Sequence, residues 1–400
     1  MRIVHVTHSL NPLKGGTSVA VKSLAEGCAM RGVASSVICL DPPQSPWLEG
    51  WQVPVCGTGP GVTHFGWSAR LGAVLHQQAQ GASVVVVHGL WQYHNVVVRR
   101  ICRDLGVPFV VYPHGMLDPW ALRQSRLVKR GGWHLVVAPL LRHAVRICFT
   151  TENEQAAAAP ALRDLPAPPL ILPLGVEGPP GDVPALRAEF FTSNPGLEGK
   201  RILLFMGRLH PKKGVDILLE GFARWRSTLP LEERQSWHLR LTGPPDSEAY
   251  LQELSDLVNS LKLEAGRDVT LPGMVSGRLR WLEFAAAEAF ILPSHQENFG
   301  IVVGEALACG SPVLLSDRVN TAPWAAQAGA GLVAPDTLEG VVELLQHWTS
   351  LTAAQQVAMR HRALELFDRQ FSVPTRCEDF LRAMREVIRA PAGSVSAGMA

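Results

Sequence analysis

Short apolar runs, each followed by a turn and then by a helical pattern, recur in two blocks of this 400-residue sequence. They are rich in Val, Ile and Leu without polar alternation, which is typical of strands covered on both faces. The runs are RIVHVTH, SSVICL, SVVVVHG, PFVVYPHG, RICFT and LILPLGV, then RILLFMGRL, HLRLTG, DVTLPG, AFILPS, SPVLLSD and AGLVAPD. Strands that alternate with helices predict parallel sheets, so the sequence favours two doubly wound, Rossmann-like α/β domains.

The two blocks are separated by a stretch rich in Pro and Gly, residues 177–199, which has no strand pattern and indicates a linker. Ligands of doubly wound sheets bind at the carboxyl ends of the strands, so two facing domains predict a central cleft. The predicted division is an N-terminal domain over 1–180, a linker over 181–199, a C-terminal domain over 200–370, a helix over 371–390 that packs back on the N-terminal domain, and a flexible tail over 391–400.

Composition excludes several classes of protein. The net charge of +2 gives no support to a nucleic-acid partner. The seven cysteines contain no Cys-x-x-Cys pair, which favours buried reduced thiols over a zinc site or a disulfide framework. The N-terminus lacks the apolar core of a signal peptide, and no apolar run of about 18 residues is present, so a cytoplasmic protein is expected.

In each block, a glycine-containing loop follows the first strand. Gly15 and Gly16 would let backbone N–H groups approach an anion at a helix start, although a plain tight turn explains them as well. In GRLHPKKG, Arg208 ends a strand and Lys213 begins a helix, so two cations and a helix N-terminus converge as in a diphosphate site. An exposed basic turn is the alternative. No Asp-x-Asp is present, which disfavours a metal-held diphosphate.

The stretch PSHQENFGIVVGEALACGSPVLLSD, residues 293–317, places two carboxylates eight positions apart. Glu297 lies in a loop beside an aromatic that looks exposed, and Glu305 lies within the helix that is expected to begin near 298–300. A loop carboxylate with free backbone N–H groups suits a hydroxylated ring, and a second carboxylate suits the vicinal diol of a ribose. A surface Glu and a Glu that complements the helix dipole explain the spacing equally well.

Taken together, these motifs resemble the GT-B glycosyltransferases of family 4, the retaining group 1 transferases. The resemblance spans nearly the whole chain. It rests on the Gly-Gly after the first strand and on YPHGMLDPWAL, GRLHPKKGVDILLEGFA and SHQENFGIVVGEALACGSPVLLSD. The last of these matches the Glu-x7-Glu motif of the family. The absence of Gly-x-Gly-x-x-Gly after a strand argues against a dehydrogenase.

The resemblance implies roles for the residues around the transferred sugar. Glu297 would contact the sugar hydroxyls, and Asn298, Phe299 and Gly300 would offer backbone N–H groups to the sugar and the phosphate. His114 would lie near the reacting carbon, a role that the spacing of residues does not predict.

The resemblance also implies a site for the rest of the donor. Glu305 would hold the ribose, and Arg208 with Lys213 would neutralise the diphosphate leaving group. Gly15 and Gly16 would approach that diphosphate from the other domain. No metal and no cofactor are expected, so the cations and helix ends would carry the positive charge. Neither carboxylate need act as a nucleophile.

The expected activity is retaining transfer of a hexose from a UDP- or GDP-linked sugar to a hydroxyl of a saccharide acceptor, for which a lipid-linked form is favoured. The loop LTGPPDSEAY departs from the Gly-rich loop of the family, so the base stays open, and no acceptor-binding residues are identified. A GT-B epimerase or phosphorylase-like enzyme is the alternative, and a non-enzymatic two-lobed binding protein is the third hypothesis.

The segment 119–151 has no acidic residue and contains Trp120 and Trp133. A peripheral contact with the inner face of a membrane would use this composition, and a solvated helix face is equally compatible with it. The dispersed histidines, among them His5 and His88, are predicted to be hydrogen-bonded core residues. The six basic residues of the segment are Arg123, Arg126, Lys129, Arg130, Arg142 and Arg146.

Overall fold

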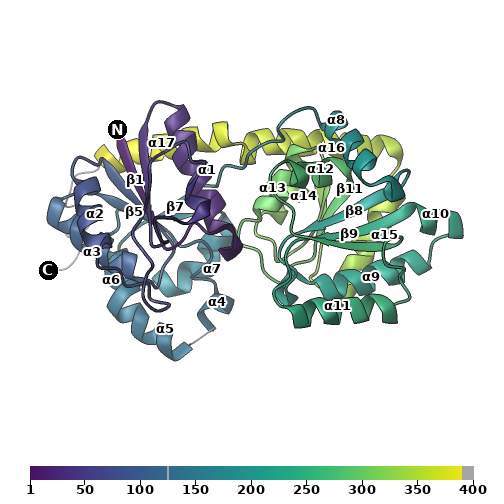
Figure 1. The fold of residues 1–400 in the computed structure, drawn as a ribbon, viewed down its shortest axis with the longest axis horizontal. Coiled ribbons are helices and arrows are strands. Elements are labelled where there is room, and N and C mark those ends of the chain that lie inside the picture. The colour runs from purple at the N-terminus through teal and green to yellow at the C-terminus, as the bar shows by residue number, and fades with distance from the viewer. Residues whose placement is uncertain (124–125, 390–400) are drawn as a thin grey trace. The chain divides into compact units, whose positions relative to one another are not determined.

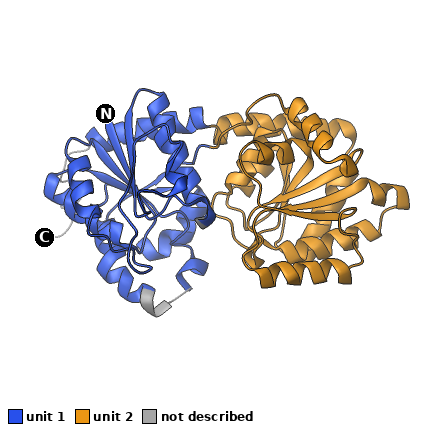
Figure 2. Ribbon diagram, viewed as in Figure 1, with its two compact units in different colours: residues 1–175, 373–400 blue, residues 176–372 orange. Residues whose placement is uncertain are grey.

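The computed structural model describes residues 1–123 and 126–389. The chain forms two compact units (Figure 2). Unit 1 contains residues 1–175 and the chain from 373 onward, and unit 2 contains residues 176–372. Each unit holds one parallel sheet with helices on both sides (Figure 1), which confirms the prediction of two doubly wound α/β domains.

The sheet of unit 1 has seven parallel strands in the order β3-β2-β1-β4-β5-β6-β7. The order reverses between β1 and β4, which is where doubly wound sheets open to ligands. The strands are β1 (Arg2–Thr7), β2 (Ala34–Cys39), β3 (Val55–Gly57), β4 (Val84–His88), β5 (Phe109–Tyr112), β6 (Arg146–Phe149) and β7 (Pro169–Ile171). Of these, β3 is a strand that the sequence did not predict, because three residues are too few to show a pattern.

The helices of unit 1 pack apolar faces on this sheet. In α1, the side chains at i, i+3, i+4 and i+7 spacing are all buried: Val21, Leu24, Ala25 and Cys28. The C-terminal helix α17 contacts α1, so it belongs to unit 1 although it follows unit 2 in the chain. The helices are α1 (Thr17–Met30), α2 (Leu71–Ala79), α3 (Tyr93–Leu105), α4 (Pro119–Arg123), α5 (Arg126–Gly132), α6 (Ala138–His143), α7 (Glu152–Leu162) and α17 (Val373–Arg389).

The sheet of unit 2 has six parallel strands in the order β10-β9-β8-β11-β12-β13, and its order reverses between β8 and β11. The strands are β8 (Arg201–Met206), β9 (Trp237–Thr242), β10 (Val269–Gly273), β11 (Ala287–Leu292), β12 (Val313–Ser316) and β13 (Gly331–Ala334). The helices are α8 (Val183–Ser193), α9 (Val215–Ser227), α10 (Leu231–Ser236), α11 (Glu248–Ser260), α12 (Arg278–Ala286), α13 (Ile301–Ala308), α14 (Ala322–Ala328), α15 (Leu338–Ser350) and α16 (Ala353–Leu366).

The structure corrects the expectation of a linker over 181–199. This segment holds the helix α8, which is capped at its start by Asp182 and packs against α12 in unit 2. Its apolar residues Leu186 and Phe190 are buried, which the Pro and Gly content on either side obscured in the sequence. The predicted flexible tail, 391–400, lies outside the described residues.

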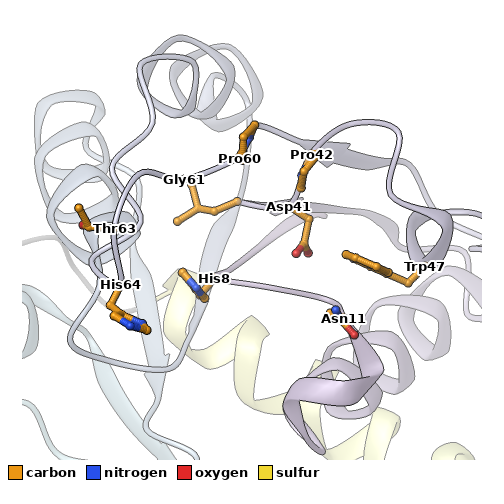
Figure 3. Close-up of a pocket in the computed structure, with 10 residues that line it drawn as sticks. His8, Asn11, Asp41, Pro42, Trp47, Pro60, Gly61, Thr63 and His64 are labelled. Atoms are coloured by element: carbon orange, nitrogen blue, oxygen red, sulfur yellow. The ribbon is translucent and has the colours of Figure 1, made fainter.

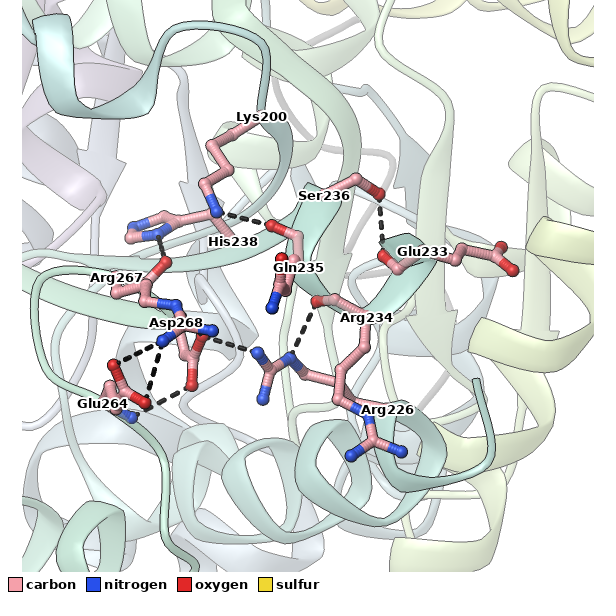
Figure 4. A network of polar contacts seen from close by, with 10 residues as sticks. All are labelled: Lys200, Arg226, Glu233, Arg234, Gln235, Ser236, His238, Glu264, Arg267 and Asp268. Atoms are coloured by element: carbon pink, nitrogen blue, oxygen red, sulfur yellow. Dashed lines mark hydrogen bonds and ion pairs between the residues drawn. The ribbon is translucent and has the colours of Figure 1, made fainter. Parts of the chain in front are cut away.

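A buried ion pair joins α9 to the loop before β10 in unit 2 (Figure 4). Arg226 Nη2 donates to Asp268 Oδ1 at 2.5 Å, and Arg226 Nε donates to the carbonyl of Arg234 at 3.0 Å. The other carboxylate oxygen of Asp268 accepts the backbone N–H of Glu264 at 3.1 Å. Both side chains are nearly inaccessible to water, so each charge depends on the other for compensation.

We therefore expect Asp268→Ala to lower the free energy of unfolding by about 3–5 kcal/mol, because it leaves a buried guanidinium without a counter-charge. The matched control is Glu264→Ala, which removes an exposed pair with Arg267 in the same network and should cost under about 1 kcal/mol. Chemical denaturation of both variants measures the difference. Equal losses would contradict the assignment of Asp268 as the buried partner.

Candidate functional site

The candidate site of unit 2 lies where the strand order reverses. The loops that follow β8 and β11 leave the sheet from neighbouring parallel strands, at their carboxyl ends. These loops are joined directly, since the backbone N–H of His295 donates to the carbonyl of Lys212 at 2.9 Å. Gly214 makes the contact possible: its φ is +66°, and a Cβ there would lie 2.4 Å from the carbonyl oxygen of Pro293.

The loop after β8 contains a short 3-10 turn, Pro211–Lys213, which ends at Gly214 just before α9. His210 begins the turn, and its Nδ1 accepts the backbone N–H of Lys212 at 2.9 Å. Arg208 lies at the end of β8 and forms a half-exposed ion pair with Asp246, in which Nη1 and Oδ1 are 3.6 Å apart. The turn thus fixes the backbone from which Lys213 projects.

The loop after β11 is anchored to the segment after β12. The backbone N–H of Glu297 donates to the carbonyl of Arg318 at 3.1 Å, and the N–H of Asn320 donates to the carbonyl of Glu297 at 3.0 Å. Phe299 is buried against Trp324 and Phe371, with ring centroids 6.1 and 5.5 Å away. The interpretation of Phe299 as exposed is wrong, because its ring secures the loop and leaves only the backbone to face a ligand.

Helix α13 begins after Gly300, which adopts φ 69° and ψ 67°. No side chain caps this end, and the first turn holds no acidic residue. The first N–H groups of a helix have no partner within it, so this N-terminus can bind an anion or a polar ligand. The loop residues Asn298, Phe299 and Gly300 precede these N–H groups directly.

Lys213 and Glu297 are brought together although 84 positions separate them, and Lys213 Nζ donates to Glu297 Oε2. Both side chains are mostly buried, at 21% and 17% exposed. The pair lies between the two joined loops, so a carboxylate and an ammonium group are held at the reversal point of the sheet. Such a pair offers an acceptor for hydroxyls and a donor for an anion.

Glu305 lies inside α13 and is paired with a residue that the sequence did not indicate. Its Oε1 is 3.0 Å from Nη1 of Arg280, in the first turn of α12, and Glu177 lies 3.9 Å from the same guanidinium. Burial raises the pKa of Glu305 to about 7; Arg280 opposes this rise and Glu177 adds to it. Glu305 therefore titrates near neutral pH.

In unit 1, Gly15 and Gly16 precede α1. Gly15 adopts φ 115°, and its N–H donates to the carbonyl of Pro12 at 3.3 Å. Gly16 is the N-cap residue of α1 and provides no side-chain cap. Both glycines are exposed, so the N-terminus of this 14-residue helix is open. These glycines and His114 lie in unit 1, whereas the other predicted site residues lie in unit 2.

His114 follows β5 and adopts φ 51°, which is unusual for a residue other than glycine. The next residue, Gly115, donates its N–H to Glu154 Oε1 at 2.6 Å, and the second oxygen of Glu154 accepts the N–H of Thr150 at 2.7 Å. The carboxylate of Glu154 thus holds the His114 loop against β6 and α7. Burial lowers the pKa of His114 to about 4, so its ring is neutral at neutral pH.

Unit 1 also contains a pocket of about 560 Å³ (Figure 3). Its walls come from the segments that follow β1, β2 and β3, at the carboxyl ends of three neighbouring strands. The carboxylate of Asp41 accepts from Ser9 Oγ and from the N–H of Leu10, both at 2.6 Å. The described residues that line it include no Lys or Arg: they are His8, Asn11, Leu40, Asp41, Pro42, Trp47, Pro60, Gly61, Thr63 and His64.

The basic segment 119–151 forms α4, α5 and α6 with a π-helical turn at Trp133–Val137. Lys129 donates to the carbonyl of Ala121 and lies over the Trp91 ring, so this cation is engaged within the unit. Trp120 and Leu135 are exposed. None of the described helices is long and apolar enough to cross a membrane.

Two family models match the chain, one in each unit. The model described as Glycosyl transferase 4-like domain matches residues 15–175, and the model described as Glycosyl transferases group 1 matches residues 187–363. The chain is 29% identical to the D-inositol 3-phosphate glycosyltransferase of Kineococcus radiotolerans over 346 residues, covering 79% of this chain and 77% of that protein. The enzyme of the same name from Acidothermus cellulolyticus is 29% identical over 321 residues, covering 75% of this chain and 70% of that protein.

Solved structures share the fold. Anabaena HepE, determined in complex with UDP-glucose, matches with a TM-score of 0.73 at 20% identity, covering 96% of this chain and 100% of that one. The sucrose-phosphate synthase of Thermosynechococcus elongatus matches with a TM-score of 0.72 at 18% identity, covering 98% of this chain and 100% of that one. Because each unit matches a glycosyltransferase model and the solved structures share the fold, the protein is a glycosyltransferase of GT-B fold.

Proposed function

We propose that the protein transfers a hexose from a nucleotide-diphosphate sugar to a saccharide hydroxyl, without a metal ion and with retention of anomeric configuration. The observation that carries the proposal is the Lys213–Glu297 pair beside the uncapped N-terminus of α13. It combines a cation and helix N–H groups for a diphosphate with a carboxylate for sugar hydroxyls.

The diphosphate would lie near Arg208, Lys213 and the first turn of α13. Negative charge grows on the oxygen that bridges sugar and phosphate as the bond breaks, and fixed cations stabilise it there. Lys213 is neutralised by Glu297 before a ligand binds, and a diphosphate would compete for its ammonium group. Glu297 would then be released to accept hydrogen bonds from the sugar.

Retention follows if the acceptor attacks from the face that the diphosphate leaves, with a phosphate oxygen taking the proton of the attacking hydroxyl. Glu297 accepts a hydrogen bond from Lys213 in the free protein and would bind the sugar hydroxyls in the complex. It does not need to act as a nucleophile in this mechanism. Closing the site against water would limit hydrolysis of the donor.

The nucleoside would be held at Glu305, whose carboxylate can accept both hydroxyls of a ribose. UDP is the favoured nucleotide, because HepE was determined with UDP and with UDP-glucose. Arg280 keeps Glu305 oriented in the free protein.

For the acceptor, the pocket of unit 1 is the proposed site. Its aromatic ring Trp47, its carboxylate Asp41 and its amide Asn11 are the groups that bind neutral sugar rings through stacking and hydroxyl contacts (Figure 3). The curated relatives are named for an inositol phosphate, but an anion would meet Asp41 here, and no Lys or Arg is among the described lining residues. The acceptor is therefore an unphosphorylated sugar ring, such as the terminal ring of a lipid-linked saccharide.

An epimerase or a phosphorylase-like enzyme would use the same fold. An epimerase converts its nucleotide sugar without a second substrate, so the separate pocket of unit 1 favours transfer over epimerisation. A phosphorylase would be revealed by activity that requires inorganic phosphate.

Replacing Glu297 by alanine tests the donor site. We expect turnover to fall about 10- to 150-fold, the equivalent of one charge-assisted hydrogen bond in the transition state. Binding of UDP should not weaken, because Lys213 loses its competing carboxylate. Glu339→Ala, which removes the exposed pair with Arg224, is the control and should leave turnover unchanged. Unchanged turnover in Glu297→Ala would refute the assigned role.

Nucleotide binding should depend on pH through Glu305. The folded protein raises the pKa of this group to about 7, so its ionised fraction grows from roughly one tenth at pH 6 to nine tenths at pH 8. Because the pKa of Glu305 is higher in the folded than in the unfolded chain, ionising this group lowers the free energy of unfolding. The loss develops as pH rises from the ordinary pKa of a glutamate through 7.

Only the carboxylate can accept both ribose hydroxyls, so the Kd for UDP should fall about tenfold between these pH values. Titration calorimetry with and without EDTA measures this. Glu305→Gln corrects for protonation of the nucleotide itself and should remove the excess pH dependence. A loss of binding in EDTA would overturn metal independence, and equal pH dependence in the variant would overturn the ribose contact.

The acceptor pocket is tested by Trp47→Ala. Losing the stacking ring should raise the acceptor KM about three- to tenfold with UDP affinity unchanged. Trp67→Ala, which removes an exposed ring outside the lining, is the control. Acceptors to compare are neutral saccharides, a lipid-linked saccharide and inositol 3-phosphate. Preference for the phosphorylated acceptor would contradict the proposal.

A further inference from the structure

Three histidines from neighbouring strands of unit 1 form one continuous hydrogen-bonded row. His5 lies in β1, His88 ends β4, and His114 follows β5, and these strands are adjacent in the sheet. His5 Nδ1 and His88 Nε2 are 3.0 Å apart, and His88 Nδ1 and His114 Nε2 are also 3.0 Å apart. The row therefore uses both nitrogens of the middle ring.

The row is enclosed by aromatic rings and is shielded from water. His5 and His88 are almost fully buried. The rings of His88 and His114 stack at 5.3 Å, and Tyr112 stacks on both of them at 5.5 and 5.6 Å. Phe380 of α17 lies 6.2 Å from His5 at the inner end. A dry environment of this kind keeps the N–H···N bonds from exchanging with water.

All three rings are neutral at neutral pH. Burial lowers the pKa of His5 to about 3 and that of His114 to about 4. The pKa of His88 lies well below its ordinary value because of burial first, and then because of its neighbours His114, His5 and His94. Each ring therefore carries one N–H group and one bare nitrogen.

Counting protons leaves two arrangements for the row. His88 has a single N–H group, so it donates to one neighbour and accepts from the other. If it donates to His114, all three rings carry their proton on Nδ1; if it donates to His5, all three carry it on Nε2. No mixed arrangement keeps both hydrogen bonds, and the tautomer of His114 is thus tied to that of a ring in β1.

At the inner end of the row, His5 has no further partner in the described part of the chain to which it could pass a proton. His5 Nε2 is buried and has no hydrogen-bond partner among the described residues. The outer end is His114, which is partly exposed and whose loop is held separately by Glu154. Its Nδ1 atom is therefore the end of the row that can contact a ligand.

We propose that His88 and His5 are positioning residues, which fix the tautomer and ring orientation of His114 so that its Nδ1 presents a single hydrogen-bonding character to the donor sugar. This inference rests on the proposed function, in which His114 contacts the substrate. A freely flipping, solvated imidazole would interconvert between donor and acceptor at that atom. In the row, His114 can change its tautomer only together with His88 and His5, so this constraint acts before the substrate binds and lowers the reorganisation required for transfer.

Nitrogen NMR of histidine-labelled protein tests the row without any turnover. The expected result is the same protonated nitrogen in His5, His88 and His114, with no titration of these rings between pH 6 and 8. Different protonated nitrogens among the three rings, or an averaged tautomer at His114, would overturn the proposal. Because this readout needs no substrate, its failure is distinct from a failure of the proposed transfer.

Kinetics of two variants test the positioning role. His88→Leu should average the tautomer of His114 and lower kcat about 10- to 100-fold with the donor KM little changed, as losing an orienting partner does elsewhere. His88→Asn places an amide group where Nδ1 lies, which can donate to His114 through its nitrogen or accept from it through its oxygen, and it should restore most of kcat and a single tautomer. An unchanged kcat in His88→Leu, or no recovery in His88→Asn, would overturn the role.

A matched control separates positioning from general stability. His238 is a buried histidine of unit 2 that contacts the carbonyl of Arg267 at 3.0 Å and Thr270 Oγ1 at 2.9 Å. His238→Leu should lower Tm by an amount similar to that of His88→Leu while leaving the His114 tautomer unchanged. A change of that tautomer in the control would show that destabilisation alone moves the signal, and would also overturn the proposal.

Discussion

The reversal of strand order within each parallel sheet is the constraint on which the functional residues depend. After β8 and β11, two neighbouring strands, the chain turns toward opposite faces of the sheet. The loops that follow these strands therefore border a crevice at the carboxyl edge of the sheet. Gly214 lets these loops come within direct hydrogen-bonding distance, because any side chain there would collide with the carbonyl of Pro293. Lys213 and Glu297 meet because the backbones beneath them are already joined.

Electrostatics in unit 2 follow from how deeply each charge is buried. Lys213 and Glu297 are largely buried and neutralise one another, which avoids the cost of an isolated charge while no ligand is bound. Glu305 lies deeper, and burial outweighs the attraction of Arg280, so its pKa rises to about 7. Arg208 is half-exposed beside Asp246. One site thus contains a largely buried ion pair, a titrating carboxyl and a half-exposed cation.

The sequence was most informative where a local pattern decides the structure. The apolar runs identified most strands, and Gly300 marked the start of α13, because both depend on neighbours in the chain. It failed where a contact joins distant residues. Nothing local to Glu305 indicates Arg280 in α12, and nothing local to Phe299 indicates the rings of Trp324 and Phe371 that bury it.

The histidine row shows that the sequence can predict the burial of single residues and still miss the contacts between them. Each histidine follows or occupies an apolar run, and the interpretation of His5 and His88 as hydrogen-bonded core residues is confirmed. The sequence could not show that they bond to one another, because this depends on strand order: β1, β4 and β5 are adjacent in the sheet but distant in the chain. The strand β3 was missed because three residues are too few to show a pattern, and the helix α8 was missed because flanking Pro and Gly residues dilute its apolar pattern.

The two units therefore handle polarity in different ways. Unit 2 places full charges at its sheet edge, which suits a ligand whose leaving group carries negative charge. Unit 1 places neutral imidazoles at its own edge, since burial keeps His114 and His88 unprotonated. If His114 contacts the substrate as proposed, a neutral donor or acceptor there neither attracts a second anion nor repels a developing positive charge on the sugar ring. This division explains why the same sheet topology, used twice, can serve the two ends of one transfer reaction.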